Sequence, residues 1–264
     1  MATESNQIDN SFFAVVGRGT VLFFEHLGRY SSSIWWMLSH AHNAKEYSRN
    51  IFSQMNQVGI SSIPIVLFVS MFIGMVSAVQ SAYQLFDWIP KSVVGSFVIK
   101  SLMLELVPLI SAIVLAGKVG ATITAEMGTM RVTEQIDALD ALAFDSISFL
   151  ITPRVLAGTI MFPILIIFGS FIGVVGGLVG AILATDVPAE AYIYGIKNTF
   201  EVYDAFIGIL KATVFGFTIT SCACYMGYYA QGGSEGVGRA TMNTVVVSCL
   251  SVVVMDFIIA SVFT

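Results

Sequence analysis

The chain has 264 residues, of which 56% are hydrophobic and only 11% are charged, and its formal net charge is −5. Soluble domains carry about 25% charged residues, so this composition excludes an ordinary water-soluble fold and indicates that lipid is the solvent for much of the surface. The negative charge and the lack of a basic patch also exclude nucleic acid as a partner. The composition therefore predicts an all-α integral membrane protein.

Residues 1–50 differ from the rest of the chain and form a separate N-terminal region. Residues 11–48 are rich in Phe, Trp and Tyr, but charged side chains interrupt them too often to leave a clean membrane span. This pattern predicts one or more interfacial helices, with Trp35 and Trp36 as anchors in the headgroup region. A strongly tilted sixth span at about residues 12–38 is the alternative.

The remaining residues, 51–264, contain long stretches with few or no charges. Because about 20 apolar residues cross the hydrocarbon core of a bilayer, these stretches predict five membrane spans. We expect the spans at about residues 62–84, 95–117, 155–185, 205–228 and 240–263.

The distribution of Lys and Arg predicts the orientation of these spans. Most Lys and Arg residues outside the spans lie in the N-terminal region and in the loops at 118–154 and 229–239. Loops on the cytoplasmic side carry an excess of positive charge. We therefore expect a cytoplasmic N-terminus and a C-terminus on the outer face.

The second span leads into a polar segment that still has a helical period, at about residues 124–143. Val132 and Ile136 fall on one face of this helix, and Glu134 and Asp137 fall on another. An interfacial helix normally presents Lys and Arg to anionic lipid, whereas this helix is acidic. The pattern therefore favours docking on a protein partner at the cytoplasmic face.

The third span carries glycines at intervals of four residues, at Gly169, Gly173 and Gly177, with Gly176 and Gly180 beside them. Small residues at this spacing allow two helices to approach closely. The stripe fits an interface between subunits or packing within the chain, and we favour packing within the chain.

Two charged residues inside the spans, Glu105 and Lys211, suggest a functional site. They lie roughly 15 Å and 9 Å deep from the outer side, at 1.5 Å per residue, so they should pair or face one wet cavity. An acid and a base between apolar walls suit an amphiphile with a zwitterionic or anionic head. A purely structural ion pair is the alternative, and Asp256 has no obvious partner in the sequence.

The chain lacks the residues that an enzyme or a metalloprotein needs. His26, His40 and His42 all lie in the N-terminal region, far along the chain from Glu105. The string most similar to a P-loop, at residues 112–122, lacks the first glycine and the Ser or Thr after Gly-Lys. We therefore predict no catalytic residues, no metal site and no cofactor bound by this chain.

The stretch LELVPLISAIVLAGKVGATITAEMGTMRVTEQIDAL, at residues 104–139, closely resembles the MlaE (YrbE) family of permeases, the membrane subunits of MCE-type lipid ABC transporters. Further matching pieces are FIGMV at 72–76, TPR at 152–154 and GYYAQGGSEGVGRAT at 227–241. One departure is Leu104, which stands where many members carry Arg. That difference would leave the cavity with one positive charge fewer in each subunit.

The resemblance implies a homodimer of five-span subunits in the cell inner membrane, each with an interfacial elbow helix. Phospholipid would bind in an outward-open cavity at the dimer interface, and an MlaD-like MCE-domain protein would stack on the outer face. Glu105 and Lys211 match positions that line this cavity. Leu85, Trp88 and Leu106 match positions that contact lipid tails.

The resemblance also implies that the segment at 124–143 is a coupling helix, held in a groove of an MlaF-like ATPase that binds ATP and Mg. The residues expected at this contact are Glu126, Met127, Met130, Arg131, Glu134, Gln135 and Asp137. The chain would then be the permease of an ATP-driven transporter that moves phospholipid between the inner membrane and the MCE partner and contributes to outer-membrane lipid homeostasis.

An ion-gradient-driven secondary transporter of an amphiphilic solute is the alternative function. Such a transporter predicts inverted repeats and broken helices at the membrane midplane. We find no repeat in the sequence, although Pro64, Pro108 and Pro163 lie where they could interrupt helices.

Overall fold

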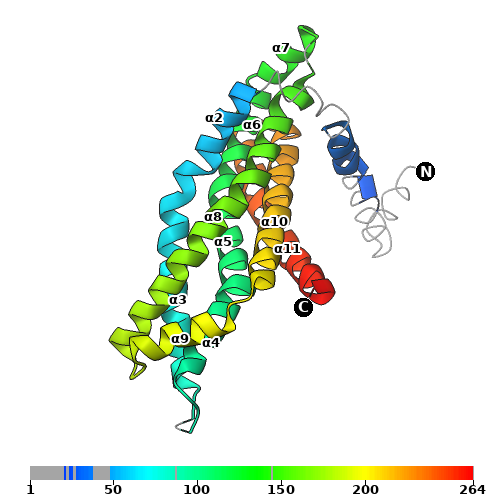
Figure 1. The fold of residues 1–264 in the computed structure, drawn as a ribbon. Coiled ribbons are helices and arrows are strands. Elements are labelled where there is room, and N and C mark those ends of the chain that lie inside the picture. Colours follow the sequence, from blue (N-terminus) through cyan, green and yellow to red (C-terminus); the bar gives the residue numbers. More distant parts are fainter. Residues whose placement is uncertain are drawn as a thin grey trace, which may run out of the picture.

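The computed structural model describes residues 21, 24, 25, 28–37, 48–86, 88–143 and 145–263, and every regular element within these ranges is helical. Figure 1 shows long helices running side by side, with a shorter helix lying across one end. Five helical stretches in the described residues are long and apolar enough to cross a membrane, which confirms the expected fold class. These stretches are Arg49–Tyr83, Ser92–Val132, Ser146–Ala184, Val202–Tyr228 and Gly233–Phe263.

The first two stretches each consist of several helical segments. Helix α2 (Ser48–Val58) and a short 3-10 turn, η3 (Ile60–Ser62), lead into α3 (Ile63–Tyr83), where Pro64 occupies the first turn. Proline is tolerated there because the amide it lacks would have no partner within the helix. The second stretch comprises α4 (Ser92–Ser101), the π-helical segment η4 (Leu102–Leu106), α5 (Val107–Leu115), the π-helical segment η5 (Ala116–Gly120) and α6 (Ala121–Val132).

The remaining helices are longer and less interrupted. After α7 (Gln135–Ala141), the chain continues as α8 (Ser146–Ala184), α9 (Ala189–Thr199), α10 (Val202–Tyr228) and α11 (Gly233–Phe263). Helix α9 is the shorter helix that crosses the end of the bundle in Figure 1, next to α4. Asp145 caps the start of α8 by accepting a hydrogen bond from the Ser148 amide.

The segment at 124–143 is not the single helix that its period predicted, because the chain turns a corner after α6. Glu134 has a φ of 60°, in the left-handed region that non-glycine residues rarely adopt. This backbone conformation ends α6, and α7 then continues in a new direction. The corner brings Ile136 back into the protein, where its side chain is fully buried. Arg131 spans the corner with an ion pair to Asp137 at 2.7 Å.

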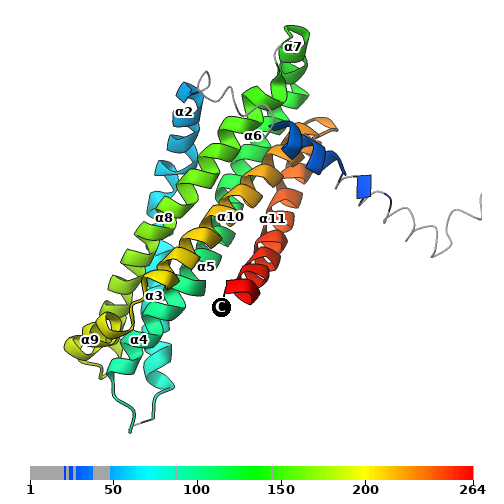
Figure 2. The same cartoon turned by 45° about the vertical axis from the view of Figure 1, so that its right-hand side comes forward.

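The glycine stripe of α8 packs against α3 within the same chain, as we favoured from the sequence. A Cβ atom at Gly74 would lie 1.8 Å from the carbonyl oxygen of Gly173, and one at Gly176 would lie 2.2 Å from that of Met71. The two helices run side by side in Figures 1 and 2. The backbones are so close that no larger residue fits at these positions.

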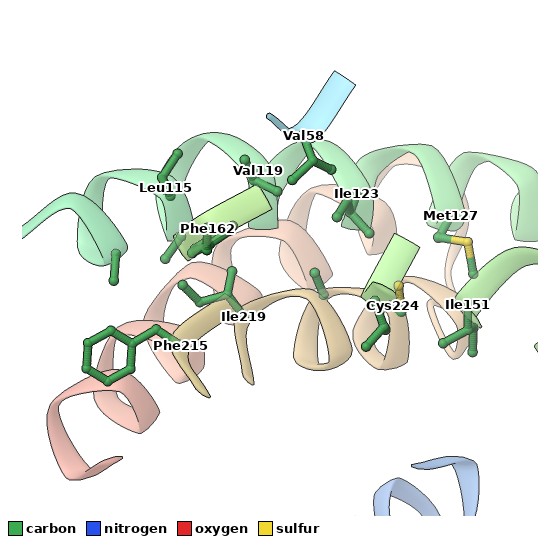
Figure 3. Close-up of a cluster of buried hydrophobic side chains, with 14 of the residues drawn as sticks. Val58, Leu115, Val119, Ile123, Met127, Ile151, Phe162, Phe215, Ile219 and Cys224 are labelled. Carbon is green, nitrogen blue, oxygen red and sulfur yellow. The ribbon is translucent and has the colours of Figure 1, made fainter. Parts of the chain in front are cut away.

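A core of buried apolar side chains holds α6 against α2, α8 and α10. Figure 3 shows part of this cluster, in which Met127 of α6 lies near Ile151 of α8 and Cys224 of α10. Ile123 points into the same cluster, as does Val58 from the end of α2. The segment that precedes the corner is therefore part of the bundle and not a loose surface helix.

Residues 28–37 form a helix that contacts the last turns of α10 and is seen in dark blue in Figure 2. The Tyr30 hydroxyl is 2.7 Å from the Ser221 hydroxyl, and the Tyr30 ring meets the Tyr225 ring edge-on. The Trp36 indole donates a hydrogen bond to Asp145 at 3.0 Å. The described part begins at residue 21, so residues 12–20 of the alternative tilted span lie outside it, and the interfacial arrangement stays a prediction.

Replacing Gly74 by alanine should destabilise the protein, because the added methyl group would push α3 away from α8. Overpacking of this kind typically costs about 1–3 kcal/mol. We expect Gly74→Ala to lower the thermal unfolding temperature in detergent. The matched control is Gly238→Ala, since a Cβ at Gly238 meets no atom within 4 Å, and this variant should melt at or above the wild-type temperature. Equal melting of both variants would contradict the close packing.

Candidate functional site

The ammonium group of Lys211, on α10, lies between two carboxylates from other spans. Its Nζ atom is 2.9 Å from Oε1 of Glu105 and 2.8 Å from Oδ1 of Asp256. The side chain of Lys211 is only 1% exposed. An isolated charge in such a place costs at least several kcal/mol, so both carboxylates are needed to stabilise it. The pairing of Glu105 with Lys211, predicted from their depths, is confirmed.

Asp256 is the member of this cluster that sequence reasoning missed. It lies on α11, about 10 Å along the helix from its C-terminal end at 1.5 Å per residue. That depth is close to the one that linked Glu105 and Lys211 and makes Asp256 a candidate for the same cluster, but depth alone does not say which helices face each other. With Asp256 included, the ion pairs connect η4, α10 and α11, and the three groups carry a formal charge of −1.

A wide helical turn positions Glu105. This residue lies in η4, a π-helical segment that ends just before α5. Pro108 follows in the first turn of α5, has no amide hydrogen, and needs space at the preceding turn. Single π turns of this kind are frequent at functional sites. The interruption of the span is therefore local, and it coincides with the acidic side chain.

Glu105 lies in the wall of a cavity of about 680 Å³ between α3 and the segments α4, η4 and α5. Most of the lining is apolar, including Phe72, Phe97 and Ile110. Leu106, which we expected to contact lipid tails, also lines the cavity. A hollow of this volume falls in the range typical of small-molecule sites, and its walls suit hydrocarbon chains.

One wall of the cavity carries a polar stripe on α3. Ser77, Gln80, Ser81 and Gln84 line it at intervals of three and four residues, which places them on a single helix face. Sequence reasoning missed this stripe, although polar residues at helical spacing inside an apolar span predict a polar face. The stripe gives the cavity hydrogen-bonding groups beside its apolar walls.

The charge that the cavity presents is negative. The Glu105 side chain is 44% exposed, whereas Lys211 is buried behind it and does not line the cavity. We expected Lys211 to line the cavity together with Glu105, but the structure places the ammonium in the protein interior. Lys211 therefore acts on the cavity through Glu105, by fixing the position of its carboxylate.

Leu85 and Trp88, which we also expected to contact lipid tails, do not line the main cavity. Leu85 lines a smaller adjoining pocket of about 140 Å³, which shares Ser81 and Gln84 with the main cavity. Trp88 is 81% exposed and stacks on Phe86, with the ring centroids 6.4 Å apart. The structure does not bring Trp88 into either pocket.

The residues expected at an ATPase contact fall into two groups. Met127 is fully buried, and Met130 packs partly buried against the same core. Glu126 accepts a hydrogen bond from Gln57 and lies 3.5 Å from the buried guanidinium of Arg154. These three residues hold α6 in the bundle.

The second group lies at the α6–α7 corner, where side chains are accessible. Glu134, Gln135 and Asp137 are exposed, and Arg131 is partly exposed. Of the seven residues, these four present polar groups outward where a partner could reach them.

Replacing Lys211 by methionine should destabilise the folded protein, because two carboxylates would remain close together without the ammonium. Breaking a buried ion pair typically costs about 3–5 kcal/mol. We expect a large drop in the thermal unfolding temperature of the purified protein.

The matched control for this prediction removes all three charges, as Lys211→Met with Glu105→Gln and Asp256→Asn. Its side chains keep nearly the same shapes, and it should recover most of the lost stability, since no charge remains unpaired. If the single and the triple variant melt alike, the ion pairs do not stabilise the fold.

Comparison with known proteins gives a consistent result over nearly the whole chain. Residues 51–262 match the family model described as Permease MlaE. A probable ABC transporter permease protein of Rickettsia prowazekii is 37% identical over 249 residues, which cover 94% of this chain and 96% of the relative. A probable ABC transporter permease protein of Synechocystis is 38% identical over 212 residues, covering 80% and 81%. A Haemophilus influenzae protein named intermembrane phospholipid transport system permease protein MlaE is 32% identical over 253 residues, covering 96% and 97%.

Proposed function

The chain belongs to the MlaE family of ABC transporter permeases, and from this membership we propose that it is the membrane subunit of an ATP-driven phospholipid transporter. An ABC permease is a non-catalytic subunit that works with a separate ATPase. ATP hydrolysis by that ATPase drives transport, so we set aside the alternative of a transporter driven by an ion gradient. We infer a place in the cell inner membrane, with the N-terminus in the cytoplasm and the C-terminus in the periplasm.

The observation that carries the proposal is the cavity beside Glu105. Its apolar walls match acyl chains, and the α3 stripe and the Glu105 carboxylate match a polar head. An exposed carboxylate attracts a cationic group, so a zwitterionic headgroup with an ammonium fits the cavity better than a purely anionic one. The name of the Haemophilus relative, a phospholipid transport permease, supports the same class of cargo.

We propose that a second copy of the chain closes this cavity. Within one chain the cavity is open on one side, and large apolar side chains at its edge are exposed, among them Phe68, Val76 and Phe97. Apolar side chains on a span can face either lipid or another helix, and the resemblance to the MlaE family implies that a second copy covers this edge. A homodimer in which each copy covers the other's apolar edge would enclose the lipid and keep the entrance toward the outer face.

A movement driven by ATP hydrolysis in the ATPase subunit would be transmitted to the cavity by a single continuous helical stretch. Residues Ser92–Val132 form one span that contains Glu105 and ends at the α6–α7 corner. We propose that the exposed residues of this corner dock on an MlaF-like ATPase. Movement of the corner would then shift α6, α5 and η4 together and change the cavity wall. On the opposite side, an MlaD-like MCE-domain protein would receive or deliver the lipid, which would contribute to outer-membrane lipid homeostasis.

The variant Glu105→Lys should abolish phospholipid transfer, because it places a second cation beside Lys211 and reverses the charge of the cavity wall. We expect at least a tenfold loss of ATP-dependent transfer of labelled phospholipid between proteoliposomes and the MCE partner, measured per assembled complex. The control Glu190→Lys makes the same charge change on α9, away from the cavity, and should transfer normally. Normal transfer by Glu105→Lys would falsify the cavity assignment.

The double variant Glu134→Lys with Asp137→Lys should release the ATPase subunit, because it reverses the charge of the corner and breaks the Arg131–Asp137 ion pair. The measurement is co-purification of the ATPase with the tagged permease. A double variant at Glu190 and Glu201, both changed to Lys on the opposite side of the membrane, should retain the ATPase. Full retention by the corner variant would count against docking at this site.

A further inference from the structure

Another cavity lies at the other end of α10, beside the segment GYYAQGGSEGVGRAT at residues 227–241. Its volume is about 390 Å³, and it opens between the helix at 28–37 and the connection from α10 to α11. Its lining includes Arg29 from the first helix, Tyr225 and Tyr229 from the end of α10, and Arg239 and Asn243 from α11.

Two guanidinium groups from separate helices line this cavity, and each is held by a weak ion pair. Arg29 lies 2.6 Å from Glu25, and Arg239 lies 2.5 Å from Glu235, each four residues away on its own helix. All four side chains are about half exposed or more, so water and salt screen both pairs. Neither glutamate lines the cavity. Both arginines can therefore exchange these partners for a stronger acceptor.

The cavity lies at the membrane surface. Residues 229–232 connect two membrane spans, so this short connection cannot extend far from the bilayer. The distribution of Lys and Arg assigns this side to the cytoplasm. Trp35, on the same helix as Arg29, is 75% exposed, as expected for an anchor among lipid headgroups.

We propose that this cavity binds the phosphate group of a phospholipid in the cytoplasmic leaflet, with a preference for anionic lipids. The planar guanidinium group of arginine matches phosphate oxygens with two parallel hydrogen bonds. Arg29 and Arg239 line one hollow at the end of two membrane spans, where lipid headgroups are expected, and Asn243 adds an amide. The tyrosine rings pack together beside them, with the Tyr225 and Tyr229 centroids 5.0 Å apart, and suit the glycerol region of the lipid.

This site is separate from the cavity beside Glu105. Tyr225 lies about 20 Å from Lys211 along α10, at 1.5 Å per residue. The inference depends on the spans and their orientation, and it does not depend on which molecule is transported. A lipid bound here would hold the N-terminal helix against α10 and α11 at the cytoplasmic face.

The test is lipid binding by the full chain, purified with its ATPase subunit and measured by native mass spectrometry. The probes are phosphatidylglycerol, diacylglycerol with the same chains but no phosphate, and inorganic phosphate alone. We expect one tight phosphatidylglycerol per chain that diacylglycerol does not replace. The double variant Arg29→Gln with Arg239→Gln should bind it about tenfold more weakly or worse, since it loses two charge-assisted interactions.

Three control variants distinguish loss of this site from a general loss of positive charge, from a disturbed N-terminal helix and from damage to the transport cavity. Arg49→Gln removes an exposed arginine of α2 outside the cavity and should bind the lipid normally. Arg239→Gln alone should also weaken binding, and it leaves the helix at 28–37 untouched. The triple variant Lys211→Met with Glu105→Gln and Asp256→Asn, which should stay folded because no charge is left unpaired, should keep this lipid even where transport fails, so failure of the transport proposal remains distinguishable.

Three results would overturn the proposal. The first is unchanged phosphatidylglycerol binding by the double variant. The second is displacement of the lipid by inorganic phosphate at equal concentration, which would assign the cavity to a free anion. The third is loss of the ATPase subunit from the double variant with lipid binding retained, which would assign the surface to a protein partner.

Discussion

Hydrocarbon does not solvate an ammonium group, and this constraint determines how three spans of the bundle meet. Lys211 is buried on α10, so its charge has to be balanced by groups from neighbouring helices. Glu105 and Asp256 supply that balance from η4 and α11. Because the Glu105 carboxylate also faces the cavity, the group that stabilises the buried cation is itself part of the cavity wall. A change in the position of the Glu105 carboxylate therefore alters the ion pairs that connect η4 with α10 and α11.

The span that carries Glu105 has two points at which its helical geometry widens. Glu105 lies in η4, and Lys118 lies in η5, where its ammonium donates a hydrogen bond to the carbonyl of Ser61 in the 3-10 turn η3. Each π-helical turn thus contains a charged side chain that ties the span to another element. Helix α5 lies between these two ties, and α6 continues from the second one toward the corner. A displacement of α6 would therefore alter first the Lys118–Ser61 hydrogen bond and then the Glu105–Lys211 ion pair.

Features that depend on composition along the chain could be predicted from the sequence. Features that depend on which side chains face each other in the folded protein could not. Long apolar stretches predicted the five-span fold, and matched depth predicted the pairing of Glu105 with Lys211. Asp256 was left unassigned because depth alone does not say which helix faces which. The corner at Glu134 was missed because a non-glycine residue with positive φ leaves no mark in the helical period. Its cause is tertiary, since the turn allows Ile136 to reach the core.

The two walls of the cavity differ in how firmly they are held. Helix α3 packs on α8 with backbone against backbone at Gly74 and Gly176, where no side chain can reorient to absorb a displacement. The opposite wall, η4 and α5, belongs to the span that ends at the accessible corner and is tied to α10 and α11 by ion pairs. Ion pairs can exchange partners as helices move, whereas helices packed backbone to backbone lose contact along the whole glycine stripe when they move apart. A force applied at the corner should therefore move the Glu105 wall against a fixed α3, and the volume of the cavity is the quantity that such a motion changes.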